Sequence, residues 1–70
     1  MRRFEIHLCQ DKDFYDVFTK ERLDEVIDCY FNTNKEAICY TLDKLLEAPK
    51  KYKHAILFDN KGKNLIFIQR

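Results

Sequence analysis

Residues 54–69 read HAILFDNKGKNLIFIQ, and this stretch decides the architecture. Two short runs rich in β-branched and aromatic residues flank a polar loop that holds Gly62, the single glycine of the chain. The pattern predicts a β-hairpin in which Gly62 takes the positive φ of a type I turn closed by a bulge. Neither run alternates apolar with polar residues, so both faces of the hairpin are apolar. We therefore expect other protein surfaces to cover both faces.

The segment before this hairpin predicts an amphipathic helix. Residues 33–36, Thr-Asn-Lys-Glu, fit the capping box in which Thr33 and Glu36 satisfy backbone donors at a helix start. Pro49 sets the end, because the residue before a proline disfavours the helical conformation. The residues that this helix is expected to bury are Ile38, Thr41, Leu42, Leu45 and Leu46.

The first thirty residues predict a strand, a second strand and a helix. Residues 3–9 alternate apolar and polar side chains, as a half-buried strand does. Residues 14–19 fit a second strand that pairs with the first across a turn at residues 11–12, with Tyr15 opposite Leu8. A short separate helix over residues 12–18 is the alternative. From an N-cap at Thr19, helical spacing continues to residue 30, and the residues of that buried stripe are Leu23, Val26, Ile27 and Tyr30.

The fold class that follows is α+β, with one domain over residues 1–70 and the order β-β-α-α-β-β. The alternative reading of residues 12–18 gives β-α-α-α-β-β. The connections are too short to wrap helices around opposite faces of a small sheet. We therefore expect a four-stranded, mostly antiparallel sheet with both helices packed on one face.

The sheet face away from the helices is then predicted to be apolar. Monomeric proteins seldom expose a large apolar patch, so this face is expected to bind a protein partner or a second copy. Cys9 falls on the same side. The predicted interface residues are Phe14, Phe18, Ala55, Leu57, Leu65 and Phe67.

Candidate catalytic and metal-binding residues are sparse. His7, Cys9 and Asp16 could meet across the first predicted hairpin, but a strand surface lacks the turn and oxyanion hole of a thiol nucleophile. His7, Cys9 and His54 lack the ligand spacing of a metal site. One glycine cannot build a phosphate-binding loop. We expect a protein that is not an enzyme and that has no metal, cofactor or small-molecule substrate.

Location and size follow from composition. Three cysteines, an odd count without CxxC spacing, indicate a reducing, cytoplasmic setting. No apolar run approaches the roughly 20 residues of a membrane span, and the start of the sequence does not resemble a signal peptide. A chain of 70 residues is near the lower limit for a stable core, so association would add stability.

Charge is unevenly distributed along the chain. Acidic residues concentrate on the first predicted helix, where like-charge pairs four residues apart disfavour an isolated helix, and such a surface fits either a basic partner or a solvated face. The predicted acidic surface is Glu21, Asp24, Glu25 and Asp28. Basic residues concentrate near the C-terminal hairpin. The candidate nucleic-acid contacts are Lys50, Lys51, Tyr52, Lys53, Lys61 and Lys63.

Two functional interpretations remain at this point. The first is a small interaction protein that acts through its apolar sheet face and acidic helix, as a homodimer or on another protein. Compact proteins of this size often serve as regulators or stoichiometric inhibitors, including those carried by phages and mobile elements. The second is a nucleic-acid-binding accessory protein that uses the C-terminal basic cluster, whose binding would be sensitive to salt.

Overall fold

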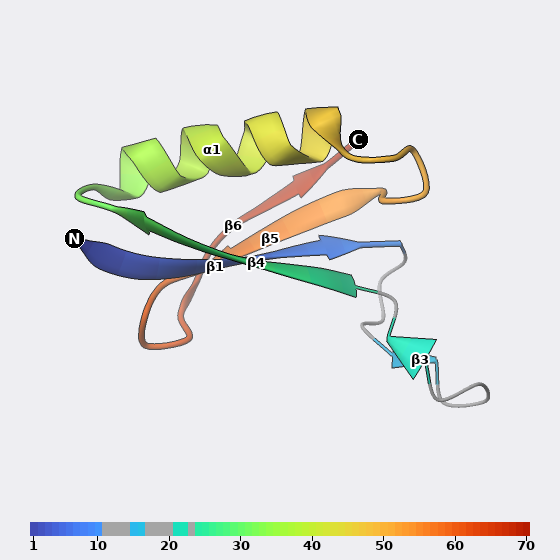
Figure 1. Cartoon of the computed structure of the whole chain (residues 1–70), viewed down its shortest axis with the longest axis horizontal. Coiled ribbons are helices and arrows are strands. Elements are labelled where there is room, and N and C mark those ends of the chain that lie inside the picture. Colours follow the sequence, from blue (N-terminus) through green and yellow to red (C-terminus); the bar gives the residue numbers. More distant parts are fainter. Residues whose placement is uncertain (11–14, 17–20, 23) are drawn as a thin grey trace.

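The structure is a computed structural model that describes residues 1–10, 15–16, 21–22 and 24–70. Its elements are β1 (Arg2–Cys9), β2 (Tyr15–Asp16), β3 (Glu21–Arg22), β4 (Asp24–Phe31), α1 (Asn34–Glu47), β5 (His54–Phe58) and β6 (Asn64–Gln69). An antiparallel four-stranded sheet has the order β4-β1-β5-β6, and β2 and β3 form a separate two-stranded ladder. Helix α1 lies along one face of the larger sheet (Figure 1). The prediction of a small α+β domain with a four-stranded antiparallel sheet is confirmed.

The helix predicted to follow Thr19 is wrong over the part that the structure describes, because residues 24–31 form strand β4. This strand pairs with β1 along its whole length, from Arg2 opposite Phe31 to Cys9 opposite Asp24. Alternation along β4 turns Cys29 into the core. β-branched and aromatic residues favour a strand where a neighbouring strand is available, and β1 is that neighbour. The described residues therefore contain one helix, α1, on the sheet face where two were expected.

The expected pairing of the first two strands is also wrong. Leu8 lies opposite Glu25 of β4 and Ala55 of β5, whereas Tyr15 pairs with Arg22 of β3. Both edges of β1 are thus occupied by long strands, so Tyr15–Asp16 does not pair with β1. The backbone is extended at Tyr15–Asp16, against the helix considered for residues 12–18. The rest of that segment and the N-cap proposed at Thr19 lie outside the described residues.

Helix α1 begins and ends where the sequence predicts. The Thr33 hydroxyl accepts a hydrogen bond from the Glu36 N–H at 3.2 Å and donates one to the Glu36 carboxylate at 3.0 Å. Ala48 leaves the helical conformation immediately before Pro49. These contacts place the helix so that Ala37, Thr41 and Leu45 face the sheet.

Two of the predicted buried helix residues are instead exposed, Leu42 by 44 % and Leu46 by 65 %. They lie about 100° further around the helix than the residues that contact the sheet. The second predicted helix would have covered them, and its place in the sequence is taken by β4.

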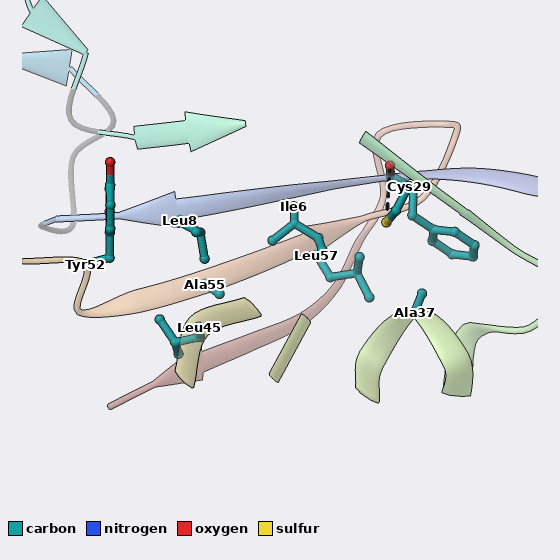
Figure 2. Close-up of a cluster of buried hydrophobic side chains, with 9 residues drawn as sticks. Ile6, Leu8, Cys29, Ala37, Leu45, Tyr52, Ala55 and Leu57 are labelled. Atoms are coloured by element: carbon teal, nitrogen blue, oxygen red, sulfur yellow. Dashed lines mark hydrogen bonds between the residues drawn. The ribbon is translucent and has the colours of Figure 1, made fainter. Parts of the chain in front are cut away.

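The core lies between α1 and the sheet face beneath it, which we call the inner face. Side chains from β1 and β5 project from this face toward Ala37 and Leu45 of the helix (Figure 2). The Cys29 thiol of β4 donates a weak hydrogen bond to the Phe4 carbonyl at 3.8 Å. The fully buried residues at the centre of this core are Phe4, Ile6, Leu45, Ala55 and Leu57.

The terminal hairpin and its glycine turn are confirmed. Gly62 has φ 81°, and its N–H donates to the Asp59 carbonyl at 3.0 Å. The Asp59 carboxylate accepts hydrogen bonds from the N–H groups of Lys61 and Lys63, at 2.9 and 2.8 Å. These contacts fold residues 59–63 into a tight turn, and they lower the pKa of the Asp59 carboxyl.

A β-bulge sets the faces of this hairpin. Phe58 lies opposite Asn64, but Leu57 lies opposite Ile66, so Leu65 is an extra residue on β6. Without the bulge, a regular ladder would place Leu57 opposite Leu65. The extra residue exchanges the faces of β5 relative to β6. Ala55 and Leu57 therefore lie on the inner face and are fully buried, so their assignment to the uncovered face is wrong.

Candidate interaction surface

The surface of interest is the sheet face turned away from α1, which we call the outer face. Strand register and alternation define it across all four strands. The outer-face residues are Arg3, Glu5, His7 and Cys9 of β1; Asp24, Val26, Asp28 and Tyr30 of β4; His54, Ile56 and Phe58 of β5; and Phe67 and Gln69 of β6.

Exposed apolar side chains stand on both edge strands of the outer face. Val26 and Tyr30 of β4 are exposed by 41 % and 57 %, and Phe67 of β6 by 51 %. Between the edge strands, Ile56 is only 8 % exposed. Val26, His7, Ile56 and Phe67 form one row across the four strands, because each lies opposite the next.

A polar cluster lies on β1 and β4 within this face. His7 Nδ1 is 2.8 Å from an Asp24 oxygen, and His7 Nε2 is 2.7 Å from a Glu5 oxygen. A neutral imidazole can donate to one of these carboxylates, whereas the imidazolium can donate to both. Next to it, Arg3 forms an ion pair with Asp28 at 2.7 Å, which raises the pKa of the guanidinium. The charges of this cluster are largely paired within the chain.

Ring contacts join the cluster to the apolar residues. The His7 ring meets Phe58 edge-on at 5.1 Å between centroids, and the His54 ring lies 5.1 Å from Phe67. Both histidines therefore support phenylalanines of the C-terminal hairpin. The outer face is thus a supported surface with aromatic residues at its β5–β6 side.

The chemistry considered for His7, Cys9 and Asp16 does not fit this arrangement. Asp16 pairs with Glu21 in the separate ladder, and Asp24 takes the expected place beside His7. Cys9 is fully buried and donates to the His7 carbonyl at 3.6 Å. Burial, with a contribution from Asp24, raises the pKa of the Cys9 thiol to about 11. A thiol of this kind stays protonated at neutral pH and is a poor nucleophile.

No group of three or more histidine, cysteine, aspartate or glutamate side chains in the described part of the chain could hold a metal ion. Cys9 lies opposite His54 on β5 and opposite Asp24 on β4, but this row does not form such a group. The described part of the chain also has no helix with the length and apolar character needed to cross a bilayer.

The predicted acidic surface does not form one patch. Asp24 and Asp28 are on the outer face, where each contacts a basic or imidazole side chain. Glu25 lies between them in sequence and therefore points to the opposite side of β4, near the C-terminal part of α1. Glu21 is part of strand β3, in the separate two-stranded ladder. The prediction of a single acidic helix face is wrong, because β4 alternates where a helix would not.

The predicted basic cluster is divided between two ends of the molecule. Lys50, Lys51 and Lys53 are on the loop before β5, and Lys61 and Lys63 are on the β5–β6 turn (Figure 1). Tyr52 is 8 % exposed and belongs to the core, with the Lys51 ammonium 5.2 Å from its ring centroid. Its ring is therefore not available for stacking on a base.

A hollow of about 500 Å³ gathers three cations at the first of these ends. It is lined by Leu46, Ala48, Lys50, Lys53 and Arg70. Arg70 was not among the predicted contacts. Its guanidinium donates to the carbonyls of Leu45 and Ala48, and so holds the end of β6 against the C-terminus of α1. A basic residue directly after an apolar strand is the sequence signal that could have indicated this role.

The structure places the predicted interface residues in different environments. Phe67 is on the outer face and exposed, whereas Leu65 is the half-buried bulge residue that packs against the core. Phe14 and Phe18 lie outside the described residues. Val26 and Tyr30 belong to the outer face, whereas the sequence predicts them on the buried side of a helix. Strand spacing is present in residues 24–31 and indicates this placement, but helical spacing is present in the same residues.

Comparisons with models of protein families, with curated proteins and with solved structures gave no match for this chain.

Proposed function

We propose that this protein is a non-enzymatic interaction module that binds a second copy or another protein through its outer face. The observation that carries the proposal is the exposure of Val26, Tyr30 and Phe67 on a sheet face that α1 does not cover. Aromatic and aliphatic side chains that are rigidly supported and half exposed are typical anchors of protein interfaces. A regulator or stoichiometric inhibitor is the kind of protein that works through such a surface alone.

The paired charges of the outer face support this proposal. Glu5, His7 and Asp24 satisfy one another, and Arg3 is paired with Asp28. A partner therefore does not have to neutralise isolated charges when it covers the apolar anchors around them. Burial of unpaired charge is among the largest costs of binding, and this surface limits that cost.

Sedimentation velocity over a dilution series tests the proposal. The wild type is expected to associate at high concentration, and Phe67→Asp is expected to weaken that association at least tenfold. Cys39→Asp is the matched control, because Cys39 is exposed on α1, away from the sheet. A chain that remains monomeric at millimolar concentration, or a Phe67→Asp variant that associates like the control, would count against self-association through the outer face.

A second candidate function is nucleic-acid binding, which the hollow beside Lys50, Lys53 and Arg70 favours. Its lining contains three cationic side chains and no acidic side chain, so it attracts phosphate. This hollow and the lysines of the β5–β6 turn lie at opposite ends of β5. The hollow can therefore contact only a short stretch of the phosphate backbone of a nucleic acid. Affinity for a long polyanion is therefore expected to be modest.

Oligonucleotide binding at low salt distinguishes this second candidate. Charge reversal of Lys50 and Lys53 should abolish binding of a fluorescent single-stranded oligonucleotide, while charge reversal of Lys61 and Lys63 should leave most of it. Equal losses in the two double variants would indicate general electrostatic attraction. Absence of binding in the wild type would remove this candidate.

A further inference from the structure

The edge of β6 away from β5 pairs with no other strand in the described part of the chain. β6 is the last strand in the order β4-β1-β5-β6, and among the described residues no strand pairs with its far side. Its sequence from Asn64 to Gln69 contains no charged residue and no proline. Natural edge strands usually carry such residues because a bare edge can pair with another chain. This edge is therefore competent to extend the sheet.

The direction of the unpaired groups on β6 follows from two hydrogen bonds. The Arg70 N–H donates to the Lys53 carbonyl at 2.8 Å, and the Asp59 N–H donates to the Lys63 carbonyl at 3.0 Å. Hydrogen-bonded and non-hydrogen-bonded pairs alternate along an antiparallel ladder. Arg70 and Lys63 point toward β5, and the alternation can be followed along β6 from either of them if the bulge at Leu65 is included. Both routes show that the N–H and C=O groups of Phe67 and Gln69 point away from β5.

The inner side of the same edge is apolar. Tyr40 on one side of α1 contacts Phe31 of β4, so the opposite side of the helix is turned toward β6. That opposite side carries Leu42 and Leu46, which are largely exposed. Beneath them, Ile66 and Ile68 of β6 are only partly buried. We call these four residues the β6 strip: Leu42, Leu46, Ile66 and Ile68.

We propose that β6 pairs antiparallel with β6 of a second copy, about a two-fold axis at Ile68. This inference goes beyond the proposed function, because the edge of β6 and the β6 strip are not part of the outer face. With Ile68 opposite Ile68 of the second copy, Phe67 lies opposite Gln69 in both directions. All the outward N–H and C=O groups of these two residues then form hydrogen bonds between the copies, and the two sheets become one.

The β6 strip explains why the partner is a second copy. When the two-fold axis is perpendicular to the sheet, the inner faces of the two copies lie on the same side of the joined sheet. The inner face of one copy then continues into the inner face of the other. The two β6 strips then lie side by side, and all four residues of each strip are uncharged. A 70-residue chain gains most from such an interface, since its own core is small.

Proline substitution tests this pairing without disturbing the hairpin. Gln69→Pro removes an N–H group that points away from β5 and that donates to the second copy in the proposed pairing. Asn64→Pro is the control, because it removes an N–H group that also points away from β5 but lies outside the proposed pairing. Sedimentation velocity should show a dimer for the wild type and for Asn64→Pro, and at least tenfold weaker association for Gln69→Pro. Circular dichroism of each variant checks that the fold is retained.

Amide hydrogen exchange of the wild type gives a reading that needs no variant. The Phe67 and Gln69 amides should exchange more slowly as concentration rises, while the Asn64 amide should not change. A dimer that persists in Gln69→Pro, with Phe67 and Gln69 amides insensitive to concentration, would overturn this pairing. If Phe67→Asp still weakened that dimer, the proposed function would survive. A wild type that stays monomeric overturns the pairing as well.

Discussion

The thiols of Cys9 and Cys39 differ in solvent exposure and therefore in expected reactivity. Cys9 is buried and its pKa is raised to about 11, whereas Cys39 is exposed on α1. Alkylation by iodoacetamide requires the thiolate and physical access. In the folded protein at neutral pH, we expect mass spectrometry to find modification at Cys39 and not at Cys9. In urea all three cysteines should react, and rapid labelling of Cys9 in the folded state would contradict its placement.

The buried thiols also predict how stability depends on pH. The unfolded chain releases thiol protons near pH ~8.5, but folded Cys9 keeps its proton until about pH 11, and the pKa of Cys29 is raised in the same direction. Between these values the unfolded state binds fewer protons, so the free energy of unfolding falls as pH rises.

Urea denaturation at increasing alkaline pH measures that fall. Cys9→Ala should make the decline shallower, while Cys39→Ala should leave it unchanged. An equally steep decline in Cys9→Ala would show that its thiol is not the source.

Gly62 is the residue on which the C-terminal turn depends. Its φ of 81° belongs to the left-handed region, and a Cβ added there would meet no atom within 4 Å. The cost of Gly62→Ala is therefore conformational, about 1 kcal/mol of unfolding free energy. Gly62→Asn should cost less, because asparagine tolerates this conformation. Chemical denaturation compares the three proteins, and equal stabilities would argue against the turn.

At the scale of the element, α1 depends on its N-cap. Thr33 accepts a hydrogen bond from the Glu36 N–H, so Thr33→Ala should lower the free energy of unfolding by about 1 kcal/mol. Thr33→Ser keeps the accepting oxygen and should retain most of the stability. Urea denaturation measures both variants. A serine variant as unstable as the alanine variant would show that the hydroxyl is not what matters.

The β6 bulge is an element whose removal has a definite consequence. Deletion of Leu65 should give a regular hairpin that keeps Ala55 opposite Ile68 and Leu57 opposite Ile66. Deletion of Phe67 should instead move Ile68 to the outer face, because side chains alternate. Cross-strand NMR contacts between β5 and β6 distinguish these registers. Loss of the Ala55–Ile68 contact on deletion of Leu65 would contradict the bulge assignment.

Local signals in the sequence predict the elements whose causes are local. The cap at Thr33, the turn at Gly62 and the alternation in residues 3–9 each depend on neighbouring residues, and all three are confirmed. Residues 24–31 contain apolar residues at both helical and strand spacing, and pairing with distant β1 decides between them. The bulge at Leu65 leaves no clear mark in the sequence, so the predicted face of Ala55 and Leu57 is wrong.

At the scale of the whole molecule, one helix faces a sheet of four strands. A helix with its side chains is about 10–12 Å across and strands are about 4.8 Å apart, so a single helix cannot cover four strands. On the inner face, the part that α1 leaves uncovered includes the β6 strip, and the outer face lies on the side of the sheet away from α1. The hairpin that is apolar on both sides predicts the uncovered outer face, although Ala55 and Leu57, which the sequence predicts there, belong to the core.

The most direct test of the central claim is solvent accessibility of the outer face as a function of concentration. A soluble paramagnetic agent broadens the NMR signals of exposed protons. At low concentration the signals of Val26, Tyr30 and Phe67 should broaden strongly, and at high concentration they should be protected, while that of Cys39 on α1 broadens equally in both. Equal broadening of all four residues at every concentration would contradict a role for the outer face in association.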